Sequence, residues 1–136
     1  MSLGNLAAER DFTYVDDTAA ALDALLWVPV QKGEVFNIGS GKVISIGALA
    51  RLLGALMGHA SITISVEDRR LRRRDLERLC CDPEKLRTRT GWTPSVGLEH
   101  GLEMTLTWFK ENGSRWLWQE RLQDSLGQDR PQLSTP

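Results

Sequence analysis

The residues best suited to chemistry are five arginines within the six positions 69–74. Guanidinium groups stay charged at any useful pH and form forked hydrogen bonds to phosphate oxygens. Acidic residues flank this cluster at Glu67, Asp68, Asp75 and Glu77. Three interpretations are open: a solvated loop partly paired with its own acids, a diphosphate-binding site, and a nucleic-acid-binding patch. The flanking acids and the lack of a recognised nucleic-acid motif count against the third.

A second candidate is the Gly-Ser-Gly-Lys segment at residues 39–42. A Walker A phosphate loop needs GxxxxGK followed by Ser or Thr, and Val43 stands at that place here. The dinucleotide-binding pattern GxGxxG also fails, because Ile44 stands where the third glycine belongs. We therefore expect a turn that ends a strand and does not bind a cofactor.

Catalytic constellations are missing from this sequence. Tyr14 is its only tyrosine and Thr18 lies four residues later, so there is no YxxxK pair. His59 follows a glycine that ends a helical pattern, and His100 lies beside acids on an expected helix. Neither histidine has a nucleophile near it in the sequence, so we expect both to be solvated. The sequence alone thus predicts no catalytic residue.

The two cysteines are adjacent, at Cys80 and Cys81. Neighbouring strand residues point to opposite faces, so these two thiols are poorly placed to bond each other. No CxxC pair or nearby histidine supports a metal site. We expect two ordinary thiols in a reducing compartment and no bound metal.

Composition sets broad limits on the protein class. A chain of 136 residues has room for one domain with a single core, and 41% hydrophobic with 26% charged residues is ordinary for a globular protein. The net charge of −1 gives no general attraction to nucleic acid or anionic membrane. No apolar run approaches the ~20 residues of a membrane span, and residues 1–10 do not form a signal peptide, so we expect a cytoplasmic protein.

Hydrophobic spacing and cap residues predict the elements that position these groups. Strands are expected where β-branched and aromatic residues concentrate, at residues 12–15, 34–38, 61–66 and 79–81. Helices are expected where leucines recur at three- and four-residue steps, at residues 18–27, 46–57, 82–91, 95–112 and 114–122. The order β-α-β-α-β, then a loop and mostly helix, favours an α/β fold with right-handed parallel crossovers.

Several short motifs, in their order, resemble the late part of extended short-chain dehydrogenases/reductases of the NAD-dependent epimerase/dehydratase family. The motifs are Leu-Gly-Asn-Leu at 3–6, Arg-Asp-Phe-Thr-Tyr-Val-Asp-Asp at 10–17, Gly-Glu-Val-Phe-Asn-Ile-Gly-Ser-Gly at 33–41, Gly-Trp-Thr-Pro at 91–94 and Trp-Phe at 108–109. Together they cover residues 3–112. The chain is most similar to sugar-nucleotide 4,6-dehydratases, and more distantly to UDP-glucose 4-epimerases and dTDP-glucose 4,6-dehydratases.

The resemblance implies an α/β fold in which residues 3–112 combine late Rossmann elements with a small substrate-binding subdomain. Residues 113–126 would form an extra helical extension and residues 127–136 a disordered tail. In the family, an N-terminal Rossmann domain holds NAD and the catalytic Tyr and Lys. We therefore expect a sugar-nucleotide-binding portion of a 4,6-dehydratase or epimerase that is not catalytic alone, with NAD bound only in the full-length enzyme.

The resemblance also implies particular contacts with a nucleotide-diphosphate sugar. Arg10 matches the family arginine that approaches the substrate diphosphate. A second such arginine precedes a short acidic signal, and with that signal at Asp75 it matches Arg70 or Arg72. Asp75 then matches the acid that binds the nucleotide ribose hydroxyls. The loop departs from the family pattern because Leu71 follows Arg70, where an Arg-Pro pair is usual.

A fragment without the Rossmann domain should expose apolar surface that the domain would otherwise bury. Its first strand, first helix and second strand would normally pack on the Rossmann domain, so we expect exposed apolar surface and a homo-oligomer. Two other functions stay open: a stand-alone module for phosphorylated ligands, and a nucleic-acid or protein interaction piece that uses the arginines at 69–74.

Overall fold

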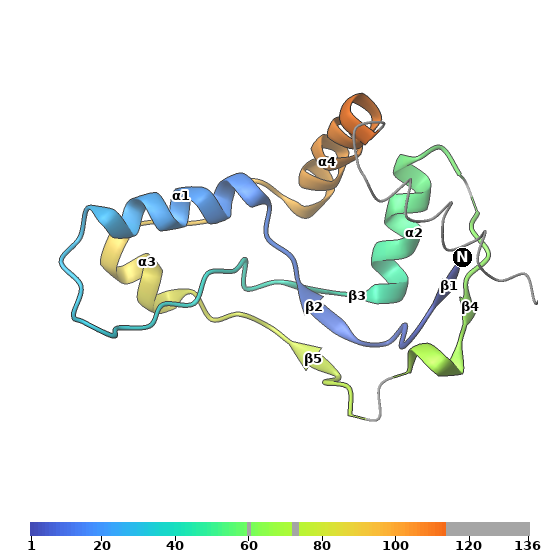
Figure 1. The fold of residues 1–136 in the computed structure, drawn as a ribbon, viewed down its shortest axis with the longest axis horizontal. Coiled ribbons are helices and arrows are strands. Elements are labelled where there is room, and N and C mark those ends of the chain that lie inside the picture. The colour runs from blue at the N-terminus through green and yellow to red at the C-terminus, as the bar shows by residue number, and fades with distance from the viewer. Residues whose placement is uncertain (60, 72–73, 114–136) are drawn as a thin grey trace, which may run out of the picture. The chain divides into compact units, whose positions relative to one another are not determined.

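The computed structural model describes residues 1–59, 61–71 and 74–113 as a mixed α/β arrangement (Figure 1). Arg72, the helix predicted at 114–122 and the tail predicted from residue 127 lie outside the described residues. The helices are α1 (Val15–Leu26), α2 (Ile46–Leu56), η1 (Asp68–Arg70, a 3-10 turn), α3 (Glu84–Thr90) and α4 (Leu98–Asn112). The strands are β1 (Ser2–Leu3), β2 (Glu9–Asp11), β3 (Val43–Ser45), β4 (Ser65–Val66) and β5 (Arg78–Leu79).

The chain forms two compact units, which divide within α4 between Glu103 and Met104. All the features described below belong to the first unit. None of the helices in the described ranges has the length and hydrophobicity that crossing a bilayer requires.

Strand β2 lies at the centre of a three-stranded sheet in the order β3-β2-β5. It pairs antiparallel with β3, where Arg10 lies opposite Ile44, and parallel with β5, where Arg10 lies opposite Leu79. Strands β1 and β4 form a separate parallel pair with Ser2 opposite Ser65. Parallel pairing, predicted from the element order, is found between β1 and β4 and between β2 and β5, whereas β2 and β3 pair antiparallel. Helix α1 runs away from β2 and the following segment returns, so β3 enters the sheet in the opposite direction (Figure 1).

The core of this unit lies between α1 and α3. Ala21, Leu86 and Trp92 are buried there, and the partly buried Phe36 and Ile38 pack against them. The small side chain of Ala21 allows α3 to approach α1 closely, and the Leu86 side chain is fully buried in the contact.

The almost fully buried carboxylate of Asp17 on α1 binds the loop after α3 through hydrogen bonds. Its Oδ1 accepts hydrogen bonds from the backbone N–H and the hydroxyl of Ser95, at 2.9 and 2.8 Å, and its Oδ2 accepts one from the Val96 N–H at 2.9 Å. The indole Nε1 of Trp92 donates to the Asp17 carbonyl oxygen at 3.1 Å. Burial alone would raise the pKa of Asp17, but the three hydrogen bonds outweigh it and hold the pKa below its usual value.

The helix predictions are confirmed where local cap chemistry determines the ends. Ser45 begins α2 by accepting a hydrogen bond from the Ala48 N–H, and Gly58 follows the helix with a φ of 82°. The Asp82 carboxylate accepts the Glu84 N–H at the start of α3, and Gly91 ends that helix with a φ of 74°. Positive φ values of this kind favour glycine because it has no Cβ.

Three strand predictions need correction. The strand expected at 12–15 lies at Glu9–Asp11, because Tyr14 is the N-cap of α1 and the acidic Asp16 and Asp17 suit the first turn of a helix. Residues 34–38 are not assigned to a strand, and the side chains of Phe36 and Ile38 pack on the core instead. Of the strand expected at 61–66, only Ser65–Val66 pairs, with β1.

The core contact predicts a large and local effect of one truncation. Leu86→Ala should lower the free energy of unfolding by about 2–4 kcal/mol, because it leaves a cavity between α1 and α3. Leu76→Ala removes the same atoms from a side chain that is 63% exposed, so its cost should stay below about 0.5 kcal/mol. Urea titrations of both variants provide the comparison, and equal costs would contradict this description of the core.

Candidate functional site

Arg10 and Asp75 form an ion pair in a pocket of about 220 Å³. The Arg10 Nη2 donates to Asp75 Oδ1 at 2.8 Å, and both side chains are largely shielded from solvent. The Asn5 Nδ2 donates to the other carboxylate oxygen at 3.2 Å. The remaining lining residues are Gly4, Ala8, Ile46 and Arg70.

Backbone carbonyls fix the position of the Arg10 guanidinium. Its Nη1 donates to the carbonyl oxygens of Glu9, at 2.7 Å, and Leu76, at 2.8 Å. The segment that carries Asp75 is thereby tied to β2 just before β5 begins. Because three of the guanidinium's five N–H donations are accounted for in this way, a phosphate would meet a charge that is already oriented.

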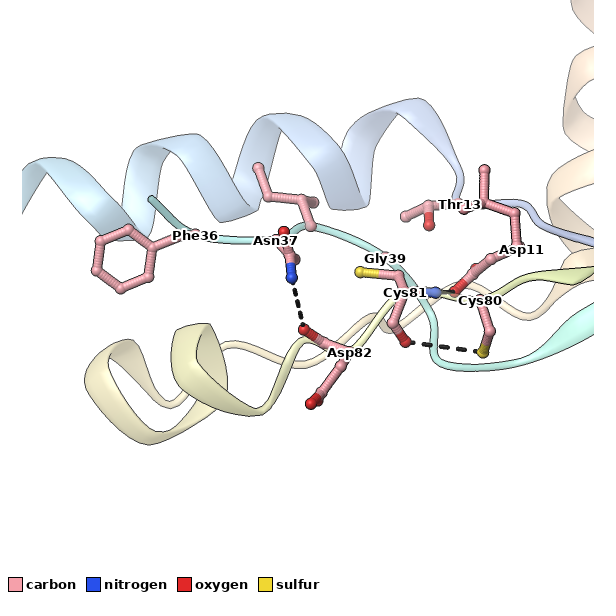
Figure 2. A pocket seen from close by; sticks show the side chains of 10 residues that line it. Asp11, Thr13, Phe36, Asn37, Gly39, Cys80, Cys81 and Asp82 are labelled. Carbon is pink, nitrogen blue, oxygen red and sulfur yellow. Dashed lines mark hydrogen bonds between the residues drawn. The ribbon is translucent and has the colours of Figure 1, made fainter. Parts of the chain in front are cut away.

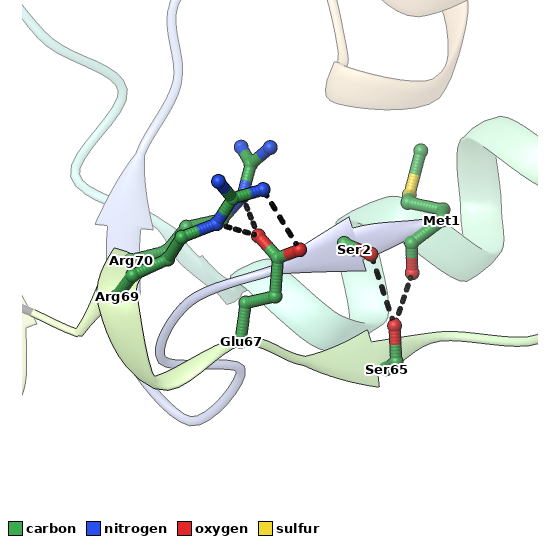
Figure 3. Close-up of polar contacts among 6 residues, drawn as sticks. All are labelled: Met1, Ser2, Ser65, Glu67, Arg69 and Arg70. Atoms are coloured by element: carbon green, nitrogen blue, oxygen red, sulfur yellow. Dashed lines mark hydrogen bonds and ion pairs between the residues drawn. The ribbon is translucent and has the colours of Figure 1, made fainter. Parts of the chain in front are cut away.

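The neighbouring Arg69 and Arg70 both pair with Glu67, on the turn that contains η1 (Figure 3). The Arg69 Nε and Nη2 donate to the two carboxylate oxygens of Glu67, each at 3.1 Å, and the Arg70 Nε also donates to Glu67 Oε2. Hydrogen bonds from Arg69 first, and then from Arg70, lower the pKa of Glu67 to about 2. Self-pairing is therefore established for these two arginines, and Arg70 in addition lines the pocket of Arg10.

The structure thus brings together three of the four predicted substrate-binding residues. Arg10, Arg70 and Asp75 line one pocket, although 65 residues separate Arg10 from Asp75. The fourth, Arg72, lies outside the described residues. Asn5 was not predicted as a site residue, although its place in the Leu-Gly-Asn-Leu motif was an available signal.

Asp11 organises the end of β2 next to this pocket. Its carboxylate accepts hydrogen bonds from the Ser40 hydroxyl at 2.6 Å, and from the backbone N–H groups of Ser40 at 3.0 Å, Gly41 at 2.8 Å and Cys81 at 3.2 Å. Burial by itself would raise the pKa of Asp11, but these four bonds together hold the pKa below its usual value. Asp11 was not predicted as a site residue from the sequence.

Gly39 allows two chain segments to meet at this carboxylate. A Cβ added to Gly39 would lie 2.2 Å from the Cβ of Cys81, a distance that no side chain tolerates. The segment 39–42 is therefore a turn folded around Asp11, in agreement with the expected turn. Two of its backbone amides already donate to a carboxylate of the same chain.

A larger pocket of about 530 Å³ lies beside the same turn (Figure 2). Asp11, Asn37 and Cys81 are among its lining residues, and the Asn37 Nδ2 donates to the Asp82 carbonyl oxygen at 3.4 Å. Both cysteines are free thiols, as expected. Burial, followed by the nearby negative charge of Asp11, raises the pKa of Cys81, so this thiol stays protonated and is a poor nucleophile. Among the described residues, no group of three or more His, Cys, Asp or Glu side chains is placed to hold a metal ion.

Residues 1–105 match the family model described as GDP-mannose 4,6 dehydratase. The UDP-glucuronate 4-epimerase of Thermodesulfobacterium geofontis is 34% identical over 110 residues, which cover 80% of this chain and 32% of that protein. The solved UDP-glucose 4-epimerase of Thermotoga maritima with UDP-glucose has a TM-score of 0.71 and 30% identity, and the match covers 81% of this chain and 34% of that one.

A second solved structure links the fold to dehydratases. The dTDP-glucose 4,6-dehydratase of Bacillus anthracis in complex with NAD has a TM-score of 0.73 and 25% identity, and the match covers 84% of this chain and 35% of that one. The chain therefore spans about a third of the length of the relatives that it matches.

The Asp11 contacts predict a pH effect on stability. Because the pKa of Asp11 is lower in the folded state, its bonds stabilise the fold fully above about pH 4 and lose that contribution as the pH falls through the folded-state value. Asp11→Asn should cost about 2 kcal/mol at pH 6, and less at pH 3. Urea unfolding at both pH values measures this difference, with the exposed Asp23→Asn as a neutral control. A cost for Asp11→Asn that is equal at the two pH values would contradict this account.

Proposed function

Because the chain belongs to the GDP-mannose 4,6 dehydratase family of NAD-dependent epimerases and dehydratases, we propose that residues 3–112 are its sugar-nucleotide-binding part. The pocket shared by Arg10, Arg70 and Asp75 carries this proposal. Its two guanidinium groups provide the charge and the forked donors that a diphosphate requires. The Asp75 carboxylate provides an acceptor for the ribose hydroxyls of the nucleotide.

The role of this pocket in the reaction is to anchor and orient the substrate. Arg10 is held by two carbonyl oxygens and by Asp75, so a diphosphate binds without first ordering that side chain. Binding energy gained at the diphosphate then fixes the position of the sugar, where dehydration or epimerisation takes place. Relatives of both reaction types match the chain, so the proposal covers 4,6-dehydratases and epimerases alike.

The turn at residues 39–42 supports a place for NAD outside the described residues. A dinucleotide needs backbone amides at a glycine turn that are free to face its diphosphate. At the turn formed by residues 39–42, the Ser40 and Gly41 amides already donate to Asp11. We therefore propose that NAD and the catalytic Tyr and Lys belong to other residues of the full-length enzyme, and that this chain is not catalytic alone.

Helix α1 carries an apolar face suited to packing against another part of such an enzyme. Val15, Leu22, Leu26 and the adjacent Trp27 are all more than half exposed, and the first three share one side of the helix. We propose that this face packs against the rest of the full-length enzyme. In the isolated chain we propose that it packs against a second copy and gives a homo-oligomer. Sedimentation as a clean monomer at high concentration would count against the second part.

Calorimetric titration with UDP, GDP and dTDP sugars tests the proposed function. One nucleotide class should bind saturably, and Arg10→Ala should weaken that binding about tenfold or more, because it removes a charge-assisted contact to phosphate. Arg87→Ala removes an exposed arginine on α3, which pairs with Glu84, and should leave the affinity unchanged.

Two results would contradict the proposal. The first is no saturable binding of any sugar nucleotide, and the second is equal loss of affinity in the Arg10→Ala and Arg87→Ala variants. Steeply salt-dependent binding to DNA, with no binding of sugar nucleotides, would instead favour the nucleic-acid interpretation of the arginines at 69–74.

A further inference from the structure

Glu67 accepts a hydrogen bond from the Nε of Arg70, a donor that a bound phosphate would use. We propose that Glu67 is an internal competitor which a phosphate ligand must displace from Arg70, so that this acid sets the affinity of the pocket. The inference rests on the proposed function of the pocket. It assigns to Glu67 the opposite effect from that of the pocket arginines, because Glu67 weakens ligand binding.

The contacts of Glu67 imitate those of a phosphate group. One carboxylate oxygen accepts from the Nε groups of both Arg69 and Arg70, and the other accepts from Arg69 Nη2 at 3.1 Å (Figure 3). A guanidinium binds a phosphate through the same N–H groups and the same forked geometry. A ligand phosphate that uses the Nε of Arg70 therefore has to replace Glu67 there.

The backbone holds the competitor in place on both sides of the turn. The Glu67 N–H donates to the Leu3 carbonyl oxygen at 2.9 Å, and the Arg70 N–H donates to the Glu67 carbonyl oxygen at 2.9 Å. A Cβ added to Gly4 would lie 2.7 Å from the Arg70 carbonyl oxygen, so only glycine lets these segments pack this closely. Exchange between Glu67 and a ligand is thus a movement of side chains over a fixed backbone.

The exposure of the two arginine side chains fits such an exchange. The Arg70 and Arg69 side chains are 53% and 78% exposed, so both can turn toward a ligand without disturbing a core. Ion pairs between exposed arginines and a surface acid are weak. Arg10, by contrast, is fixed by carbonyl oxygens and stays in the pocket throughout. A diphosphate therefore exchanges with Glu67 at Arg70 while it meets Arg10 already in position.

Calorimetric titration with inorganic pyrophosphate, at low and moderate salt, tests this inference. Glu67→Gln keeps the size of the side chain and removes its charge, so pyrophosphate should bind about 2- to 5-fold tighter. Asp68→Asn removes the same charge from the next residue. Among the described residues, the Asp68 side chain forms no hydrogen bond or ion pair with Arg70, so this variant should change the affinity less than twofold. In an Arg70→Ala background, Glu67→Gln should have no effect, because the competition acts through Arg70.

The outcomes separate this inference from the proposed function. Pyrophosphate binding of equal strength by the wild-type chain and Glu67→Gln would overturn the inference and leave the proposed function standing. So would an equal gain in Asp68→Asn, or a gain that persists with Arg70→Ala, because either result would reduce the effect to general electrostatics. Absence of binding by all variants, together with no binding of sugar nucleotides, would overturn both.

Discussion

The Asp11 carboxylate is the contact on which the arrangement around the pocket depends. Its four hydrogen bonds hold the turn at residues 39–42 and the segment after β5 against the end of β2. These partners are distant from Asp11 in the sequence. Successive strand residues point to opposite faces. Asp11 therefore faces the turn while Arg10, one residue earlier, reaches Asp75. Strand β2 thus carries both Asp11, which stabilises the local fold, and Arg10, the cation of the proposed site. Stability and ligand binding therefore depend on the same short strand.

The charges around the pocket explain why two interpretations of the arginines at 69–74 are compatible. Arg69 and Arg70 are paired with Glu67, as expected of a solvated charged loop, and Arg70 also lines the pocket of Arg10. Exposed pairs of this kind add little to stability. Their consequence lies in binding, because an acid that already occupies a guanidinium has to be displaced before a phosphate can bind there.

Local signals in the sequence predicted the helices better than the strands. The ends of α2 and α3 follow from Ser45, Asp82 and two glycines, each of which acts within a few residues of the end it determines. Strand pairing depends on distant partners, so the segment at 34–38 has strand-like residues but is not assigned to a strand. The proposed site residues Arg10, Arg70 and Asp75 were named from the family resemblance. Their meeting depends on contacts across 65 residues. Pairing of the arginines with flanking acids was one interpretation open from the sequence, and the structure shows that Glu67 is the acid that pairs with Arg69 and Arg70.

The most direct test of the central claim is an NMR titration that follows the arginine Nε–H resonances of this chain as UDP is added. Contact with a diphosphate should shift the resonances of Arg10 and Arg70 together, with one saturation curve, while that of Arg87 on α3 stays in place. The account would be contradicted if Arg10 and Arg70 did not respond at a saturating concentration, or if all exposed arginines shifted alike, since general ionic attraction would then explain the binding.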